Sequence, residues 1–523
     1  MRKGIPRYVV ISYLTIFSIG TQYFTNLAYL MGQVTIQDTF NSGTYGVIVP
    51  TVLSYLAFAT FLAIGPLLAK RYGLRRMYLF FVMLLVLGAL SDFLAPDSLL
   101  FSLGRLLQGA GSGALYMVMV PLTALAIPTQ HRNWFVFIIL SGLFGALGIG
   151  GVFGGLSLTV DAWRWLFALS ALFSLTTLVL GYIVLPQQRP PMSSTIVDKW
   201  GTMLLFTIAA VLVWPLMNLQ RLGLDSIRIW PLFALALGLF VLFVALELIV
   251  PEPVIPFRLL AAPKPLFGTV MAAAANIAVT CAVIGISGYL INIEQVHFIS
   301  LAEFFIGFFL GTVASGLLSA WLYDKLGAGL LGVIASIVVV YVGISWAHMG
   351  AGVPIVTLEW QLALLGAAFG IILVTGSLGG TLAAKDISEL ASLSMGMQYI
   401  RNLFSAFGSP VFGWIVLNAT TIHYEQLQSR LTVNSPFAVM ELNQIAASFG
   451  RYDGAQTSRA MATYVLADRV QSASMLFAYQ ELFSILLILS LFMLAGSLGM
   501  TMTGKGMAIA QEQDPLIGLY PST

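Results

Sequence analysis

An arginine and a glutamine lie inside an apolar stretch that is long enough to cross a bilayer. The stretch LLFSLGRLLQGAGSGALYMVMVPL covers residues 99–122, and Gln108 follows Arg105 on the same helical face. A guanidinium at the centre of a membrane helix costs about 2.5–3.5 kcal/mol on insertion scales. Arg105 therefore indicates a water-filled cavity or a buried partner, and the alternative is a side chain that snorkels to the membrane surface.

Two more polar stripes follow helical periodicity within apolar stretches. One stripe, at spacings of three and four, comprises Ser394, Gln398, Arg401, Asn402 and Ser405. The other is neutral and comprises Thr15, Ser18, Gln22, Thr25 and Asn26. Side chains of this kind lose hydrogen bonds when they face lipid, so both stripes are predicted to line a cavity or a helix interface. For the neutral stripe, bonds from Ser and Thr to their own helix carbonyls are the alternative.

Few carboxylates lie near the apolar stretches, and most of them are within two turns of an end. Glu481 is expected to be the deepest, because it follows the start of the last stretch by about two turns. Burial favours the neutral form of a carboxylic acid. We therefore predict Glu481, Glu294 and Glu303 as protonation candidates.

The composition requires these residues to be positioned by membrane helices. Of the 523 residues, 59% are hydrophobic and 9% are charged, whereas soluble domains have about 45–50% and about 25%. Continuous rather than alternating apolar runs disfavour a β-barrel. With about 20 residues needed per crossing, we predict an all-α membrane protein with fourteen spans. They lie near residues 8–30, 45–69, 77–95, 99–123, 134–157, 163–185, 200–219, 229–250, 266–291, 304–323, 329–347, 358–383, 393–417 and 474–501.

The basic residues gather on alternate connections between the predicted spans. One such connection holds Lys70, Arg71, Arg75 and Arg76, and the excess of positive charge predicts that both termini are cytoplasmic. On the other side lies one long connection, residues 418–473, whose segment 422–431 is compatible with a helix. Connections of this length are often functional. We expect either a docking surface, for example for a periplasmic adaptor protein, or an inert cap.

An internal repeat indicates how the spans are grouped. Superposing Gly73 on Gly327 gives an offset of 254 residues, and superposing residues 105–113 on 362–370 gives 257. Repeats of membrane helices with a site at their interface are typical of secondary transporters. The chain is predicted to consist of a six-helix half (1–190), two inserted helices (191–262) and a second six-helix half (263–523).

Four motifs resemble those of the major facilitator superfamily. LLAKRYGLRR resembles the loop between its second and third helices, GRLLQG its fourth-helix motif, GIGGVFGG the fifth-helix motif of its antiporter branch, and DAWRWLFAL the start of its sixth helix. With fourteen spans and a long connection before the last one, the whole chain resembles the EmrB/QacA type of drug:proton antiporters. The resemblance implies the major facilitator fold, with two inserted helices between two six-helix halves.

The resemblance also implies roles for residues in this chain. Arg105 matches an arginine implicated in proton transfer, and Gly150, Gly151, Gly154 and Gly155 match the helix pair that seals the inner cavity. The gating loop corresponds to Lys70, Arg71, Gly73, Arg75 and Arg76, with Asp324 in the second half. The chain departs from the pattern where Lys70 replaces an aspartate and where the first span, unlike that of the family, has no carboxylate.

These features predict a secondary active exporter of amphipathic small molecules in the bacterial cytoplasmic membrane, operating by alternating access and coupled to protons. The alternative is a dedicated exporter of an endogenous metabolite such as a siderophore, whose anionic groups suit two buried arginines. A membrane enzyme is disfavoured because neither paired carboxylates nor a metal-ligand cluster is evident, and a channel because the repeat suits rocking. We expect small-molecule substrate and membrane lipid as partners, no nucleic acid, no metal and no cofactor.

Overall fold

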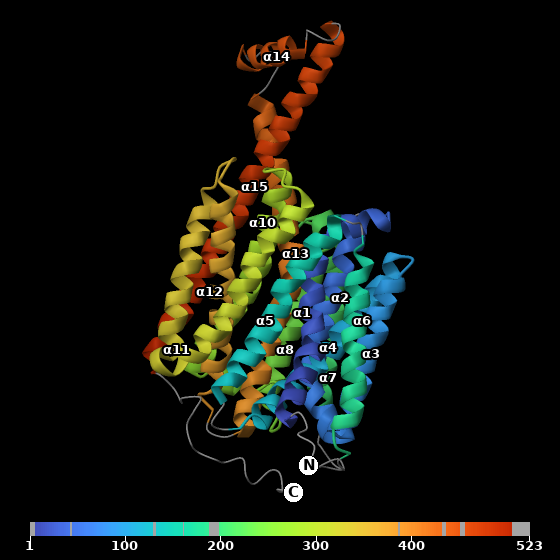
Figure 1. Cartoon of the computed structure of the whole chain (residues 1–523), viewed down its shortest axis with the longest axis vertical. Helices are drawn as coiled ribbons and strands as arrows, with labels where there is room; N and C mark the ends of the chain where they lie inside the picture. Colours follow the sequence, from blue (N-terminus) through green and yellow to red (C-terminus); the bar gives the residue numbers. More distant parts are fainter. Residues whose placement is uncertain are drawn as a thin grey trace.

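The computed structural model describes residues 6–41, 44–128, 132–159, 162–187, 198–384, 387–430, 436–449 and 455–504. Every regular element in these ranges is a helix, and most helices run side by side in one bundle (Figure 1). The helices are α1 (Arg7–Thr39), α2 (Thr44–Tyr72), α3 (Leu74–Leu94), α4 (Ser98–Ala126), α5 (Arg132–Thr159), α6 (Arg164–Val184), α7 (Lys199–Leu222), α8 (Trp230–Glu247), α9 (Phe257–Leu260), α10 (Pro263–Asn292), α11 (Phe298–Ala347), α12 (Ile355–Thr381), α13 (Ile387–Arg430), α14 (Pro436–Phe449) and α15 (Ala455–Met502).

Membrane-spanning helices account for almost all of this fold. Within the described residues, twelve helices are long and apolar enough to cross a membrane. The helix α11 is one of the twelve, although Gly327, with φ 79° and ψ 164°, divides it into two helices. The polar-striped α1, with 33 residues, is outside the twelve but also runs along the bundle (Figure 1). Counting α11 as two helices and adding α1 to the other eleven gives fourteen helices, the number of stretches that the sequence predicts.

Two of the turns between these helices have a glycine with the same backbone conformation. Gly73 joins α2 to α3 with φ 88° and ψ 147°, close to the values of Gly327 inside α11. Residues with a Cβ rarely adopt this conformation, so glycine is required where one helix turns directly into the next. The two glycines that the sequence repeat aligns thus have the same local conformation.

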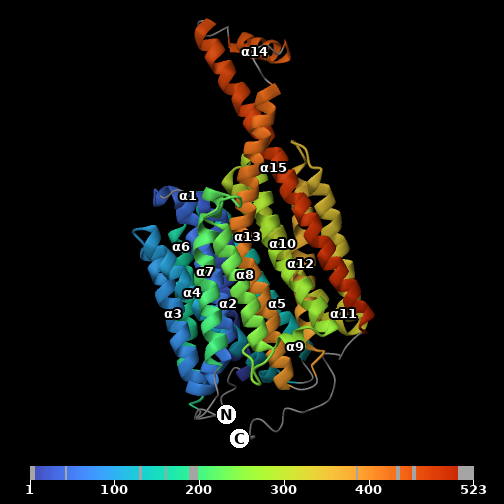
Figure 2. The same cartoon turned by 180° about the vertical axis from the view of Figure 1, so that it is seen from behind.

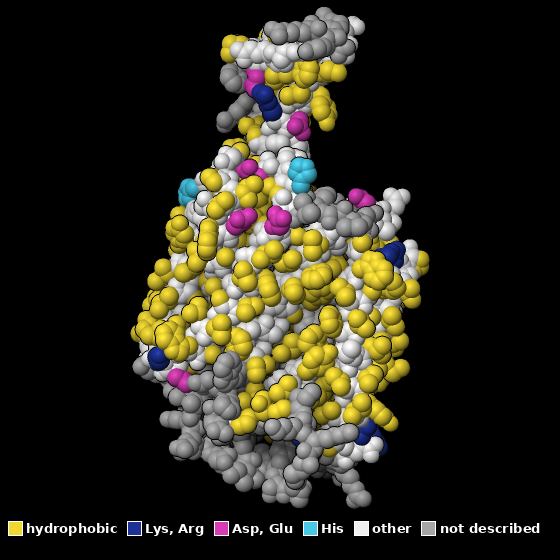
Figure 3. Space-filling view, viewed as in Figure 1, with side chains coloured by type: hydrophobic (Ala, Val, Ile, Leu, Met, Phe, Trp, Pro, Cys, Tyr) yellow, Lys and Arg dark blue, Asp and Glu magenta, His cyan; other side chains and the backbone are white. Residues whose placement is uncertain are grey.

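Two large apolar clusters make up the core. One draws mainly on α10, α11, α12 and α15, and the other on α2, α3, α4, α7, α8 and part of α13. The helix α5 lies between α1 and α11, while α13 packs against α2 and also against α7. Figure 2 shows α7 and α8 on the side of the bundle near α2 and α13. Apolar side chains cover the flanks of the bundle, as a membrane protein requires (Figure 3).

The connection at residues 418–473, predicted as a long loop, is mostly helical. The helix α13 continues to Arg430, which confirms the predicted helix up to that residue, and α15 begins at Ala455. Both helices extend beyond the bundle, and α14 lies across them at the tip (Figure 1). We call residues 418–473 the stalk; its residues 431–435 and 450–454 lie outside the described part. On the opposite face of the bundle α1 begins and α15 ends.

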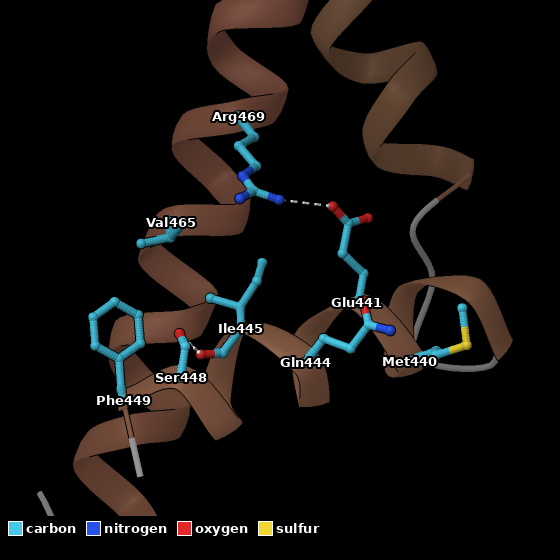
Figure 4. A pocket seen from close by; sticks show the side chains of 8 residues that line it. All are labelled: Met440, Glu441, Gln444, Ile445, Ser448, Phe449, Val465 and Arg469. Carbon is cyan, nitrogen blue, oxygen red and sulfur yellow. Dashed lines mark hydrogen bonds and ion pairs between the residues drawn. The ribbon is translucent and has the colours of Figure 1, made fainter. Parts of the chain in front are cut away.

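A small pocket lies between α14 and α15 in the stalk (Figure 4). Its volume is about 560 Å³, and Arg469 of α15 donates a hydrogen bond of 3.2 Å to Glu441 of α14 across it. Both partners are partly exposed, and pairs of this kind contribute little to stability. This ion pair therefore adds little to the stability of the stalk.

Candidate functional site

Arg105 is the centre of a buried polar network between α1 and α4. Its side chain is 1% exposed, and Nη1 donates to Oγ1 of Thr25 at 2.8 Å and to Oε1 of Gln108 at 2.7 Å. The other terminal nitrogen donates to Oδ1 of Asn26. All of these acceptors are neutral. The alternative of a snorkelling arginine is thus wrong, because the guanidinium points into the bundle and binds the polar stripe of α1.

The network continues from α1 to α2. Gln22 donates through Nε2 to Oδ1 of Asn26 at 3.0 Å and to Oγ of Ser54 at 2.5 Å. Five residues that the sequence singles out from two different spans therefore form one hydrogen-bonded group: Gln22, Thr25, Asn26, Arg105 and Gln108.

Small residues on α4 allow this close approach of the helices. A Cβ added at Gly109 would lie 2.2 Å from the carbonyl oxygen of Ser54, and one added at Gly113 would lie 2.2 Å from that of Phe58. The backbones of α2 and α4 are therefore in contact, as small-xxx-small faces permit. This contact brings Ser54 within reach of the α1 stripe.

Aromatic side chains surround the network where α1, α4 and α6 meet. The guanidinium of Arg105 lies 5.7 Å from the ring centre of Tyr29. Behind Tyr29, the rings of Phe101, Trp163 and Phe167 pack edge to face with centroid separations between 5.2 and 6.1 Å. Such an environment excludes water and strengthens the polar interactions of the guanidinium.

The sequence analysis misses one residue of this site, Asp92 of α3. Its side chain is 0% exposed, and the charge of Arg105 attracts it. Asp92 is close to the predicted end of its span, where hydropathy does not distinguish a buried carboxylate from one that reaches water. The available signal was a second charged residue within one predicted helical hairpin, residues 77–123.

Arg401 forms a second buried site between α13 and the first helices of the chain. It is 2% exposed, and Nη2 donates to the hydroxyl of Tyr23 at 3.0 Å. Tyr116 of α4 also interacts with its guanidinium. Four residues of the predicted stripe on α13 are buried and Ser394 is partly buried, but Asn402 donates to the carbonyl oxygen of Gln398 within the same helix. Arg401 therefore connects the C-terminal helices with α1 and α4.

The three predicted protonation candidates do not share this buried environment. Glu481 is 54% exposed and accepts a 2.8 Å bond from Nε2 of His423. Glu294 accepts from the Tyr289 hydroxyl at 2.5 Å and from the backbone N–H of Gly352 at 2.7 Å, which ties two loops together. Glu303 is exposed. The expectation that Glu481 is the deepest carboxylate is wrong, because Asp92 is fully buried.

The four predicted glycines of α5 form two opposite contact faces. A Cβ at Gly150 would lie 2.3 Å from the carbonyl oxygen of Phe24 in α1, and Gly154 faces the same helix. A Cβ at Gly151 or at Gly155 would lie 2.7 or 2.8 Å from atoms of α11. The helix α5 is therefore packed closely between α1, the helix that holds Asn26, and α11.

The predicted gating loop lies at the junction of α2 and α3. Lys70, Arg71 and Arg76 are exposed, whereas Arg75 donates to the backbone carbonyl of Tyr182 in α6 at 2.6 Å. Its guanidinium also lies 4.9 Å from the Tyr182 ring centre. Asp324 lies on α11, next to the turn at Gly327. The loop is thus anchored to α6 by one of its arginines.

No group of three or more potential metal ligands (His, Cys, Asp or Glu) exists among the described residues. A helical membrane bundle with buried charged residues on facing helices is typical of membrane proteins that move ions or substrates.

The chain belongs to the major facilitator superfamily, whose profile matches residues 12–410. It is 28% identical to the MFS-type transporter YubD of Bacillus subtilis (strain 168), over 97% of this chain and 90% of YubD. It is 27% identical to the quinolone resistance protein NorB of Staphylococcus aureus (strain JH9), over 48% of this chain and 53% of NorB.

Solved structures show the same fold at low identity. A bacterial homolog of the human lysosomal transporter Spinster matches with a TM-score of 0.56 and 14% identity, covering 96% of this chain and 98% of the homolog. The peptide transporter POT in complex with sulfate matches with a TM-score of 0.58 and 14% identity, covering 97% of each chain. The family and the similarity to YubD over nearly the whole chain define the protein as a multi-pass membrane transporter of small molecules.

Proposed function

We propose that the protein exports amphipathic small molecules across the bacterial cytoplasmic membrane in exchange for protons, as a fourteen-helix antiporter of the EmrB/QacA type. The observation that carries this proposal is the buried network of Arg105, which binds α1 and α4 through neutral acceptors. A charge held in a membrane bundle without a lipid-facing role is expensive and marks an ion or substrate pathway. The similarity of half of the chain to a quinolone resistance protein supports a drug-like substrate.

Alternating access in this proposal uses the contacts of α5. Its glycine faces pack against α1 and α11, and the helices can slide or rock there without losing apolar contact. The domain division proposed from the sequence repeat, 1–190 and 263–523 with 191–262 between them, assigns α1 and α5 to one half and α11 to the other. The basic loop with Lys70, Arg71, Gly73, Arg75 and Arg76 acts as the cytoplasmic gate, together with Asp324 in the second half.

A second candidate function is the export of an endogenous anionic metabolite such as a siderophore. Arg401 favours this candidate, because a buried guanidinium between Tyr23 and Tyr116 is suited to an anion or a polar group. Multidrug transporters of cations need a carboxylate in the cavity, whereas the polar stripe on α13 carries a positive charge.

The proposed placement in the membrane has both termini in the cytoplasm and the stalk outside. The stalk then is the part of the chain that a periplasmic adaptor protein would contact, since it projects beyond the bundle (Figure 1). Labelling of single cysteines with a membrane-impermeant reagent in intact cells tests this. We expect the reagent to label a cysteine in place of Tyr464, whose side chain is 75% exposed, and not a cysteine in place of Tyr72.

Uphill transport by reconstituted protein tests the function. Inside-out proteoliposomes with an acidic lumen receive norfloxacin, ethidium or an anionic iron chelator, and uptake is compared with and without the pH gradient. Accumulation of norfloxacin or ethidium that depends on the gradient supports the drug antiporter. Accumulation of the chelator alone supports the second candidate, and uptake that never exceeds equilibrium contradicts both.

A further inference from the structure

Asp92 is a buried carboxyl group without hydrogen bonds. It lies in the membrane-spanning part of α3 and is 0% exposed. Among the described residues, neither Oδ1 nor Oδ2 has a hydrogen-bond partner. An ionised carboxylate in an apolar interior needs donors or a close counter-charge, whereas the protonated acid needs far less compensation. The arrangement in the structure therefore suits the neutral acid.

Close packing of α3 on α4 fixes the position of this carboxyl group. A Cβ at Gly104 would lie 2.1 Å from Oδ1 of Asp92, so the carboxyl group occupies the space above that glycine. One turn earlier, a Cβ at Gly88 would lie 2.7 Å from the carbonyl oxygen of Gly104 and 3.0 Å from Gln108. Asp92 thus packs directly against the α4 segment that carries Arg105 and Gln108.

The charged and titratable neighbours of Asp92 come from several helices. Arg105 of α4 attracts it, and Tyr29 of α1 is a further titratable neighbour. On α6, Arg164 donates to the backbone carbonyls of Phe93 and Ala95, not to the carboxyl group. On α2, Tyr55 interacts with Arg105. Arg105 is therefore the cation to which an ionised Asp92 would turn.

Arg105 has an unused donor for this purpose. Its terminal nitrogens bind Thr25, Asn26 and Gln108, but within the described part of the chain its Nε has no acceptor. An unpaired donor on Arg105 and an unpaired acid on the adjacent helix are therefore present in one buried region. The guanidinium is bonded to the α1 stripe in this structure, and an ionised Asp92 would offer it a second acceptor.

We propose that Asp92 is the carboxyl group that carries the proton in transport, and that its deprotonation draws Arg105 away from α1. With Asp92 protonated, Arg105 bonds Thr25 and Asn26 and holds α1 against α4. When the proton leaves, the carboxylate and guanidinium pair with each other, and α1 is released. Because α5 packs against both α1 and α11, the movement of α1 reaches the interface between α5 and α11. This inference rests on the proposed proton-coupled function.

The first experiment detects the protonated acid without any substrate. Infrared spectra of the purified full-length protein are recorded across a pH titration, and the carbonyl stretching band of protonated carboxyl groups is followed. We expect the wild-type band to contain a titrating component that is missing in Asp92→Asn and retained in Asp97→Asn. Asp97 is an exposed N-cap of α4, and Asn caps a helix as well as Asp does. A band that persists unchanged in Asp92→Asn overturns the proposal.

The second experiment measures gradient-driven transport in the same two variants. In proteoliposomes, Asp92→Asn is expected to lower gradient-driven norfloxacin accumulation at least about tenfold, as loss of a membrane proton carrier should. Asp97→Asn, the matched control, retains gradient-driven accumulation, and a monodisperse size-exclusion peak shows that Asp92→Asn is folded. Normal gradient-driven accumulation by Asp92→Asn overturns the inference.

The two proposals can fail separately. If the wild type transports none of the probes uphill, the proposed function fails, and the infrared titration alone decides whether Asp92 exchanges a proton. If Asp92→Asn cannot be purified in folded form, the double variant with Arg105→Gln replaces it, because it leaves no unpaired buried cation. A titrating band that survives in the double variant overturns the assignment.

Discussion

The contact between α1 and α5 at Gly150 gives a prediction whose size follows from the structure. A Cβ at this position would lie 2.3 Å from the carbonyl oxygen of Phe24, whereas ordinary contact begins at 3.4 Å. In Gly150→Ala the two helices must therefore separate by about 1 Å, and overpacking of this kind costs about 1–3 kcal/mol. Because Thr25 and Asn26 follow Phe24 on α1, the separation also weakens their bonds to Arg105.

Gly145 of the same helix is the matched control. A Cβ there would meet its nearest atom, Cγ2 of Val313, at 3.5 Å, which is ordinary contact. Both variants add one methyl group and gain the same helix propensity, about 1 kcal/mol in water-exposed helices. Gly145→Ala is therefore expected to be at least as stable as the wild type.

Thermal stability in detergent, followed as loss of the monodisperse peak in size-exclusion chromatography, measures the difference. If each kcal/mol moves the midpoint by about 2 °C, the midpoint of Gly150→Ala falls about 2–6 °C below that of Gly145→Ala. Gradient-driven transport falls in the same variant. Equal midpoints for the two alanine variants would refute the close approach of α1 and α5.

Three further substitutions test other parts of the structure. Arg105→Gln is expected to lose at least about tenfold in gradient-driven transport while still reaching the membrane, because its bonds to α1 are charge-assisted; wild-type transport contradicts this role. Glu247→Gln is expected to keep wild-type thermal stability, because an amide still accepts from the N–H of Ile255 and can donate to the adjacent Asp198. Glu247→Ala is expected to lose about 1–3 kcal/mol, because it leaves that N–H unpaired. Equal stability of the two variants would contradict this prediction. Glu481→Gln retains proton-driven transport, because the carboxylate belongs to an exposed pair with a histidine; loss of coupling in reconstituted protein would return Glu481 to the protonation candidates.

Local patterns in the sequence predict much of the fold. A run of apolar residues must form a helix in lipid, because no water is available to satisfy its backbone. The turns at Gly73 and Gly327 are also local features, since their backbone conformation favours glycine over residues with a Cβ. Only the stalk departs from this expectation, because a polar segment of that composition can be loop or helix, and it folds as extensions of α13 and α15.

Part of the candidate site is also visible in the sequence. Helical spacing groups Gln22, Thr25 and Asn26 on one face, and Arg105 with Gln108 on another. Each stripe needs a polar partner, and hydropathy alone shows this. Helical spacing does not show which stripes contact each other, because these contacts join distant parts of the chain. The bond from Arg105 to Asn26 joins residues 79 positions apart, and the bond from Arg401 to Tyr23 joins residues 378 positions apart.

The sequence by itself therefore determined a multi-span helical membrane protein with charged residues held inside its spans. The tertiary structure decided which of those residues interact and how deeply they are buried. Asp92 illustrates the difference, since it is near the end of a helix and its burial depends on the approach of α3 to α4 at Gly88 and Gly104. Hydropathy and periodicity are properties of one helix, whereas desolvation of a carboxyl group depends on the helices packed against it.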